Sequence, residues 1–323
     1  MIAENLRVLV AEDMNAVDAC IRRHLQSDVI LVNQVAEYII QGGGKRLRPM
    51  LTVLVAKSLG YSGVHHHTLA AVVELIHTAT LLHDDVVDKS ELRRGRETAN
   101  EMFGNEASVL VGDFVYSRSF QMMVSVDRLD VMRILSDATN VIAEGEVLQL
   151  MNSHDPDLTE QQYFQVIGYK TAQLFEAAAR LGAVINDASA EVEGAVASFG
   201  RQLGVAFQII DDVLDYSGDP QVTGKNVGDD LNEGKVTLPL LLAMRHVSEP
   251  DRLFLRKVIT EGGVNHWSRV VELIKYCGVL PMAHQRAVLG MEQAVQVLLQ
   301  QVPLTPYREG LVHLARLAVQ RTQ

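Results

Sequence analysis

The chain has 323 residues, of which 48% are hydrophobic and 21% charged, and its formal net charge at pH 7 is −11. This length allows one large domain or two ordinary ones, and the apolar content excludes an intrinsically disordered chain. The acidic balance argues against a protein that binds nucleic acid over its whole surface. The two cysteines, Cys20 and Cys277, match neither a disulfide framework nor a zinc-binding spacing, and we expect both to be buried reduced thiols.

The N-terminal segment carries acids where a secretory signal would carry bases and an apolar run. The most hydrophobic stretch, 68–82, is interrupted by Glu74 and His77 and is too short to span a bilayer. We therefore expect a cytoplasmic protein.

Apolar residues recur at helical spacing along most of the chain, for example over 8–21 and 69–79. No proline falls between Pro49 and Pro156, and this favours long helices because an interior proline costs about 3 kcal/mol. The alternation typical of strands is hard to find. These patterns predict an all-α fold.

Glycine-rich or polar segments separate the expected helices, at 42–44, 61–63, 152–157 and 217–234. None of them has the length or composition of a linker between domains. The histidine tract, His65-His66-His67, follows the second of these segments, and we interpret it as a solvated turn rather than a metal site.

The pattern Asp-Asp-x-x-Asp occurs twice, each time inside an apolar helical stretch, HTATLLHDDVVD and AFQIIDDVLD. The first aspartate motif is Asp84, Asp85 and Asp88, and the second is Asp211, Asp212 and Asp215. Because positions i and i+4 share a helix face, the outer two aspartates of each motif point the same way. Like charges at this spacing are destabilising unless something neutralises them.

A divalent cation with oxygen ligands, such as Mg²⁺, is the natural neutraliser of such a cluster. Few carboxylates in each motif leave coordination positions for water and a substrate phosphate. The alternative is that the acids stand at helix N-termini, where the helix dipole favours them. Two identical motifs inside apolar helices favour the metal site.

The basic residues that stand out in the sequence lie close to glycines or to the aspartate motifs. They are Lys45, Arg46 and Arg48 after a glycine run, Arg93 and Arg94 after the first motif, and Lys225 and Lys235 after the second. Arginine and lysine side chains both suit phosphate oxygens, and glycines let the backbone approach an anion closely. Neither a Walker loop nor a dinucleotide-binding glycine motif is present. A ligand with a diphosphate at one end and a hydrocarbon at the other would match this pattern. The chemistry would be departure of the diphosphate from the hydrocarbon, with metals and bases stabilising the negative charge that develops on it.

Six segments in order carry a family resemblance: GGGKRLRP, HTATLLHDDVVD, RRG, YKTAQLF, FQIIDDVLD and GKNVGDDLNEGKVTLP. Over roughly 42–239 the chain resembles the trans-isoprenyl diphosphate synthases, and within them most closely the bacterial octaprenyl (polyprenyl) branch of quinone side-chain synthesis. The resemblance implies one all-α domain over 1–323, a bundle of long helices around a deep central cavity. It also implies a homodimer and two to three Mg²⁺ ions.

The resemblance also assigns roles to residues. Both aspartate motifs would bind Mg²⁺, with Asp84, Asp85, Asp88, Asp211, Asp212 and Lys170 as the catalytic set. Isopentenyl diphosphate would be held by Lys45, Arg48, His77 and Arg94. The allylic diphosphate would be held by Arg93, Lys170, Thr171, Gln208, Lys225 and Lys235. The allylic C–O bond would ionise, the isopentenyl double bond would attack the carbocation, and a proton would be lost.

Product length depends on the helix that precedes the first aspartate motif. In short-chain relatives bulky aromatics near the positions of Ala79 and Thr80 close the pocket, whereas here both residues are small. One further turn back lies Ile76, and Met123 with its neighbour Met122 is a candidate for the pocket floor. We therefore expect a C40 product, with C35 to C45 allowed, made from farnesyl diphosphate.

The strongest alternative is a shorter-chain synthase that makes farnesyl or geranylgeranyl diphosphate. A terpene cyclase is disfavoured because the second Asp-Asp-x-x-Asp is intact and a second diphosphate site is present. An inactive partner subunit would be expected to have lost the aspartates. Release of an oily product suggests transient contact with a membrane.

Overall fold

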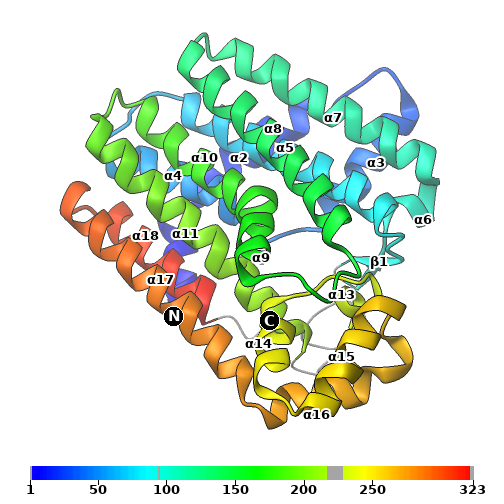
Figure 1. Cartoon of the computed structure of the whole chain (residues 1–323). Coiled ribbons are helices and arrows are strands. Elements are labelled where there is room, and N and C mark those ends of the chain that lie inside the picture. Colours follow the sequence, from blue (N-terminus) through cyan, green and yellow to red (C-terminus); the bar gives the residue numbers. More distant parts are fainter. Residues whose placement is uncertain (1, 94, 217–227, 321–323) are drawn as a thin grey trace. The chain divides into compact units, whose positions relative to one another are not determined.

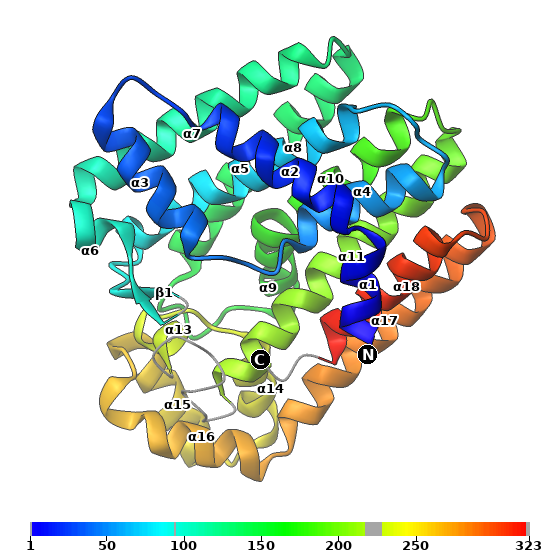
Figure 2. The same ribbon diagram turned by 180° about the vertical axis from the view of Figure 1, so that it is seen from behind.

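The computed structural model of the chain describes residues 2–93, 95–216 and 228–320 (Figures 1 and 2). The helices and strands are α1 (Ile2–Leu9), α2 (Ala11–His24), α3 (Ile30–Gln41), α4 (Leu47–Ser58), α5 (His65–Val87), β1 (Leu92–Arg93), β2 (Arg96–Glu97), α6 (Ala99–Phe103), α7 (Asn105–Ser125), α8 (Leu129–Asn152), α9 (Glu160–Ile167), η1 (Gly168–Ala172), α10 (Gln173–Val184), α11 (Ala190–Asp215), α13 (Asp229–Asn232), α14 (Leu238–His246), α15 (Glu249–Glu261), η2 (Val264–His266), α16 (Trp267–Tyr276), α17 (Val279–Gln301) and α18 (Pro306–Val319). The all-α prediction is confirmed.

The only pairing of strands in the described part of the chain is the short antiparallel hairpin β1–β2, in which Leu92 faces Glu97 and Arg93 faces Arg96. Gly95 in its turn has a positive φ of 73°, a conformation that glycine adopts without strain. This hairpin was not predicted from the sequence, because strands of two residues leave no alternation to detect.

Contacts between residues divide the chain into two compact units. Unit 1 comprises Met1–Thr139, Leu174–Gly200 and Val295–Ala315, and unit 2 comprises Asn140–Gln173, Arg201–Ala294 and Arg316–Gln323. The first aspartate motif belongs to unit 1 and the second to unit 2. The single domain expected over 1–323 stays a prediction.

Helix α5 is the core of unit 1, where it packs against α7, α4 and α2 (Figures 1 and 2). Every residue from Leu69 to Ile76 is buried, and all of them except Glu74 are apolar, as expected of a helix in the interior. Ser108 on α7 donates from its hydroxyl to the Leu82 carbonyl at 2.9 Å. This packing fixes the half of α5 that carries the first aspartate motif.

The start of α5 corrects one interpretation of the sequence. The histidine tract is the first turn of this helix and not a solvated turn. His66 is only 2% exposed, and its neighbours His65 and His67 are half-buried. Helical spacing could not reveal this burial, because the side chains that cover His66 come from elsewhere in the chain.

Unit 2 contains the connected segments α9 and η1 and the group α14, α15 and α16, with α14 in contact with α9, α15 and α16. Helix α9 begins with a capping box in which Thr159 and Gln162 satisfy each other's backbone N–H groups. Tyr216, just after α11, stacks on Trp267 with ring centroids 5.4 Å apart. These contacts fix the second aspartate motif within unit 2.

Among the described residues, no helix combines the length and apolar character that crossing a membrane requires. Cys20 is buried and Cys277 is half-buried, and both are free thiols. The expectation of full burial holds for Cys20 alone, and the reduced state of both thiols stays a prediction.

Candidate active site

The first aspartate motif occupies the last turn of α5. Asp84 and Asp88 are half-buried and lie one turn apart, and the Asp88 N–H donates to the Asp84 carbonyl at 2.8 Å. Asp85 faces the interior and is only 4% exposed. The motif therefore presents two carboxylates on one helix face and buries the third.

Asp85 is paired with Arg93. Nε and Nη2 of Arg93 lie 2.8 and 2.6 Å from Oδ1 of Asp85, and Arg93 comes from strand β1. A charge-assisted bond of this kind is about twice as strong as a neutral one. Asp85 thus holds a guanidinium beside the motif, where Arg93 was expected to grip the allylic diphosphate.

The basic residues around the start of α4 are held by two interactions within unit 1, one made by Arg48 and one by Arg46. The guanidinium carbon of Arg48 lies 4.3 Å from the centroid of the buried Phe175 ring, a cation–π geometry that fixes the half-buried side chain. Lys45 is exposed. Both residues were expected to hold isopentenyl diphosphate, together with the half-buried His77 and with Arg94, which lies outside the described residues.

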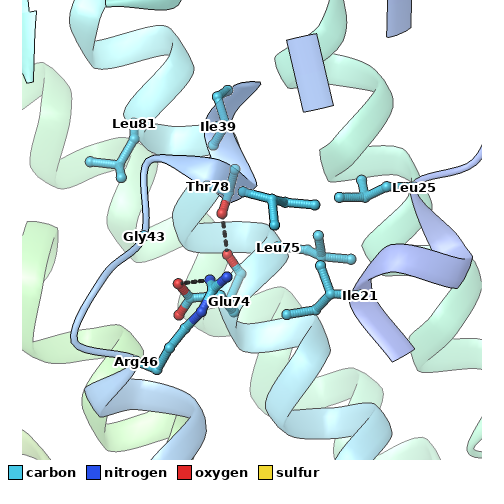
Figure 3. Close-up of a pocket in the computed structure, with 10 residues that line it drawn as sticks. Ile21, Leu25, Ile39, Gly43, Arg46, Glu74, Leu75, Thr78 and Leu81 are labelled. Atoms are coloured by element: carbon cyan, nitrogen blue, oxygen red, sulfur yellow. Dashed lines mark hydrogen bonds and ion pairs between the residues drawn. The ribbon is translucent and has the colours of Figure 1, made fainter. Parts of the chain in front are cut away.

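Arg46 turns inward between these two bases. It has a positive φ of 50°, and its guanidinium forms an ion pair with Glu74 in a pocket whose other walls include Ile21 and Leu25 (Figure 3). Glu74 stands on α5 one turn before His77, and Thr78 donates to its backbone carbonyl at 2.8 Å. The pair anchors the unusual backbone of the basic segment to α5.

The second aspartate motif ends α11 and is more deeply buried than the first. Asp212 is 2% and Asp215 8% exposed, whereas Asp211 is half-buried. The Tyr163 hydroxyl donates to Oδ2 of Asp212 at 2.6 Å, and the Gln208 amide donates to Oδ1 at 2.9 Å. These bonds satisfy both oxygens of the Asp212 carboxyl group.

Burial, together with the nearby carboxylates of Asp230 and Asp211, raises the pKa of Asp212 to about 8. A carboxyl group in such surroundings is poorly stabilised as an anion without a cation. Carboxylate oxygens are the donors that a hard divalent cation such as Mg²⁺ prefers, so the residues of this motif fit that ion.

A hydrogen-bond chain links Asp212 to two predicted ligands of the allylic diphosphate. Thr171 donates from its hydroxyl to Oε1 of Gln208 at 2.9 Å, and Gln208 donates to Asp212. Thr171 and Lys170 lie in η1, a π-helical turn between α9 and α10. Such turns occur mostly as single insertions in α-helices and are frequent at functional sites.

Lys170 is positioned by α8. Its Nζ lies 2.6 Å from Oε2 of Glu146, and the neighbouring Gly145 allows the close approach of the two backbones. A Cβ atom at position 145 would lie only 2.7 Å from the backbone nitrogen of Lys170. Gly145 and Tyr163 are site residues that no motif in the sequence had indicated.

The remaining predicted residues are placed as follows. Lys235 pairs with Glu233, and Lys225 lies outside the described residues. Ile76 and Ala79 are buried, and Thr80 is half-buried with its hydroxyl donating to the His77 carbonyl at 2.8 Å.

Met122 and Met123 are buried on α7, which packs against α5. This arrangement suits either a pocket floor or an ordinary core, so the role of Met123 stays a prediction.

Comparison with known proteins decides the family. Residues 29–276 match the polyprenyl synthetase family. The chain belongs to this family. It is 54% identical to the octaprenyl diphosphate synthase of Escherichia coli over 319 residues, which cover 98% of each chain. It is 44% identical to the all-trans-nonaprenyl-diphosphate synthase (geranyl-diphosphate specific) of Rhodobacter capsulatus, over 97% of this chain and 96% of that one.

A solved structure agrees with this family membership. The polyprenyl synthase of Caulobacter crescentus, complexed with calcium and isoprenyl diphosphate, superposes with a TM-score of 0.95. Its sequence is 44% identical, and the match covers 99% of this chain and 98% of that chain. The resemblance inferred from the motifs is therefore confirmed, as is the all-α fold of the family.

We expect the substitution Asp212→Asn to stabilise the metal-free protein, and to do so more at pH 9 than at pH 6. The folded pKa of about 8 lies above the reference value of 3.8, so the folded state binds more protons between these limits. The free energy of unfolding of the parent protein therefore falls as the pH rises towards 8. The variant does not show this fall, because the Asn side chain has no proton to lose.

Thermal unfolding in EDTA at both pH values measures the effect, and at pH 9 we expect a rise in Tm of at least about 3 °C. Asp28→Asn is the control, because Asp28 is exposed and its replacement should leave Tm unchanged. A gain for Asp212→Asn that does not depend on pH would contradict the assignment.

We expect Gly145→Ala to lower the free energy of unfolding by about 1–3 kcal/mol, because its Cβ would displace η1. If Lys170 acts on substrate, moving it should also slow prenyl transfer about tenfold to a hundredfold. The matched control is Gly194→Ala, since a Cβ at this exposed helical position meets no atom within 4 Å. Chemical denaturation and a steady-state assay check both effects, and equal behaviour of the two variants would refute the close-approach argument.

Proposed function

We propose that this chain is a long-chain trans-polyprenyl diphosphate synthase that adds isopentenyl diphosphate units to an allylic diphosphate and makes octaprenyl diphosphate, C40, from farnesyl diphosphate. The observation that carries the proposal is the pair of aspartate motifs at helix C-termini, together with two cations that are each held by a carboxylate. Arg93 is held by Asp85 in one unit, and Lys170 is held by Glu146 in the other. The 54% identity with an octaprenyl diphosphate synthase supports the product length.

The metal ions of the proposal are Mg²⁺, held by Asp84, Asp85 and Asp88 and by Asp211, Asp212 and Asp215. Mg²⁺ bound there would supply a Lewis acid that stabilises negative charge on the diphosphate oxygens. The donor set supports this assignment, since carboxylates in low-dielectric surroundings favour a bound cation. A related synthase has been solved with calcium, another hard divalent cation.

The bases of the chain stabilise the departing diphosphate. As the allylic C–O bond breaks, negative charge grows on the leaving group, and a cation already fixed in place stabilises that charge without reorganisation. Arg93 and Lys170 are fixed by their carboxylate partners, and the Thr171 hydroxyl is oriented by Gln208. Lys225 and Lys235 complete the proposed allylic set.

The second substrate, isopentenyl diphosphate, is held in the proposal by Lys45, Arg48, His77 and Arg94. The stacking of Arg48 on Phe175 supports this role, because a pre-oriented guanidinium loses little side-chain entropy on binding a phosphate. The Arg46–Glu74 pair fixes the backbone between Lys45 and Arg48.

Product length is set in the proposal by the small side chain of Ala79 and by Thr80 on α5, with Ile76 deeper and Met123 as the floor. Each helical turn back from the first motif adds about 5.4 Å for the growing tail. Ala79 is 1% exposed, and an aromatic ring at this position would take up volume that its methyl group does not.

The wider setting of the enzyme is also proposed. It acts as a cytoplasmic homodimer, supplies the side chain of ubiquinone and touches a membrane transiently when its oily product leaves. The resemblance to the bacterial polyprenyl synthases of quinone side-chain synthesis supports this setting.

Incubation of the protein with Mg²⁺, farnesyl diphosphate and radiolabelled isopentenyl diphosphate tests the proposal. We expect a dominant C40 product, and no product when EDTA replaces Mg²⁺. The variant Ala79→Tyr should stop elongation earlier and give products of about C15 to C20. Formation of these products would also show that the variant is folded. Replacing the buried Ala70 on the same helix by Val is the control, and it should keep C40. No condensation by the parent protein would refute the function, and C40 from Ala79→Tyr would refute the pocket.

A further inference from the structure

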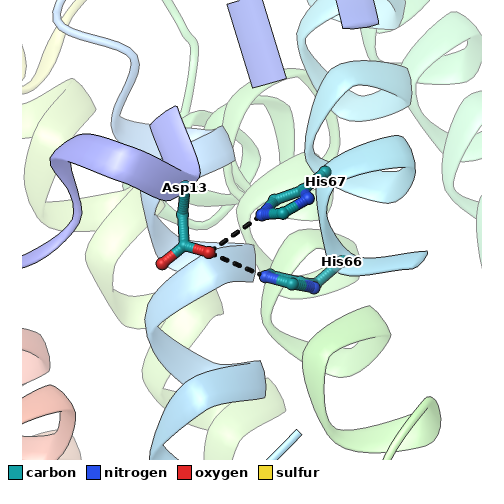
Figure 4. Close-up of side chains that lie close together, drawn as sticks. All are labelled: Asp13, His66 and His67. Carbon is teal, nitrogen blue, oxygen red and sulfur yellow. Dashed lines mark hydrogen bonds and ion pairs between the residues drawn. The ribbon is translucent and has the colours of Figure 1, made fainter. Parts of the chain in front are cut away.

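A second group of ligand-type side chains lies at the opposite end of α5 from the first aspartate motif. Asp13 on α2 and His66 and His67 in the first turn of α5 converge, with the two Nε2 atoms 3.0 and 2.8 Å from the same Asp13 Oδ1 (Figure 4). We call these three residues the Asp13–histidine cluster. His66 precedes Asp84 by 84 − 66 = 18 residues, which is about 27 Å along the helix at 1.5 Å per residue. The cluster is therefore separate from the proposed Mg²⁺ site on α5.

The cluster is shielded from solvent. The side chains of His66, Asp13 and His67 are 2%, 14% and 23% exposed. Burial lowers the pKa of His66, so its imidazole is neutral and can offer a lone pair near pH 7. Neutral imidazoles and an ionised carboxylate are the protonation states in which these residues bind a metal.

Hydrogen bonding alone does not satisfy the buried imidazole. Nδ1 of His66 is buried and has no hydrogen-bond partner among the described residues. Coordination of an ion through Nε2 would place the ring proton of His66 on Nδ1.

The donor set and its dimensions suit zinc. Two imidazole nitrogens and one carboxylate oxygen are the ligands of a familiar class of Zn²⁺ sites, in which water completes a tetrahedron. Ligand atoms about 2.0–2.1 Å from a tetrahedral ion are about 3.3 Å apart. The three ligand atoms here all lie within 4.8 Å of one another, so small side-chain movements would form the site. Mg²⁺ prefers oxygen ligands and would not compete well here.

We propose that Asp13, His66 and His67 bind a divalent transition-metal ion of the Zn²⁺ class, with water as the fourth ligand, and that this ion ties α2 to the start of α5. The ion would be structural, since it would join two segments that are 66 − 13 = 53 residues apart in the chain. It would stabilise the helix that carries the first aspartate motif without entering the reaction.

The experiment is a titration of the metal-stripped full-length protein with Zn²⁺, and then with Co²⁺, in excess Mg²⁺ that occupies the aspartate motifs. We expect one equivalent of Zn²⁺ to bind by calorimetry and to raise Tm. Co²⁺ should give the intense visible bands of a tetrahedral site. His67→Gln and Asp13→Asn should each weaken Zn²⁺ binding at least about tenfold and abolish the rise in Tm.

The matched control is His65→Gln, which removes the adjacent histidine that is not part of the cluster and should bind Zn²⁺ like the parent protein. Circular dichroism and prenyl-transfer assays in Mg²⁺ show whether each variant is folded. Zn²⁺ binding that is equal in His67→Gln and His65→Gln would overturn the proposal, as would the absence of binding to the folded parent protein. A Zn²⁺ equivalent lost in Asp84→Asn instead would assign the ion to the first aspartate motif and overturn it too.

Discussion

The burial of carboxylates of like charge at the ends of two helices is the constraint on which the rest of the candidate site depends. Burial and the neighbouring carboxylates oppose ionisation of Asp212, and Asp85 is buried as well. Each carboxyl group has specific partners. Arg93 forms an ion pair with Asp85, and Tyr163 and Gln208 donate hydrogen bonds to Asp212. These partners do not compensate all the negative charge of the two aspartate motifs, and a divalent cation would neutralise the remainder.

Two departures from regular geometry accompany the candidate site. The π-helical turn η1, which carries Lys170 and Thr171, interrupts a helical region, and Gly145 has no side chain to block this turn. Arg46 adopts a left-handed backbone conformation before α4, and its ion pair with Glu74 holds that conformation. In both places an unfavourable local conformation is stabilised by a contact from another helix, as is common at functional sites.

The two groups of ligand-type side chains differ in chemistry. The aspartate motifs offer oxygen atoms alone, which suits exchange of Mg²⁺ and a diphosphate. The Asp13–histidine cluster offers two nitrogens and one oxygen, which suits a more tightly held ion. One helix, α5, carries ligands of both kinds at its opposite ends, so stabilising its start would also steady its functional end.

The sequence by itself determined the helical class, the loop at 42–44, the repeated aspartate motif and, through ordered motifs, the family. These features are local, because helical spacing and glycine preference depend on residues a few positions apart. Only the tertiary structure decided that Arg93 pairs with Asp85, that Tyr163 binds Asp212, and that His66 is buried against Asp13 instead of solvated. Tyr163 and Asp212 are 49 residues apart, and His66 and Asp13 are 53 apart. No periodicity encodes such pairs, because packing between helices selects them.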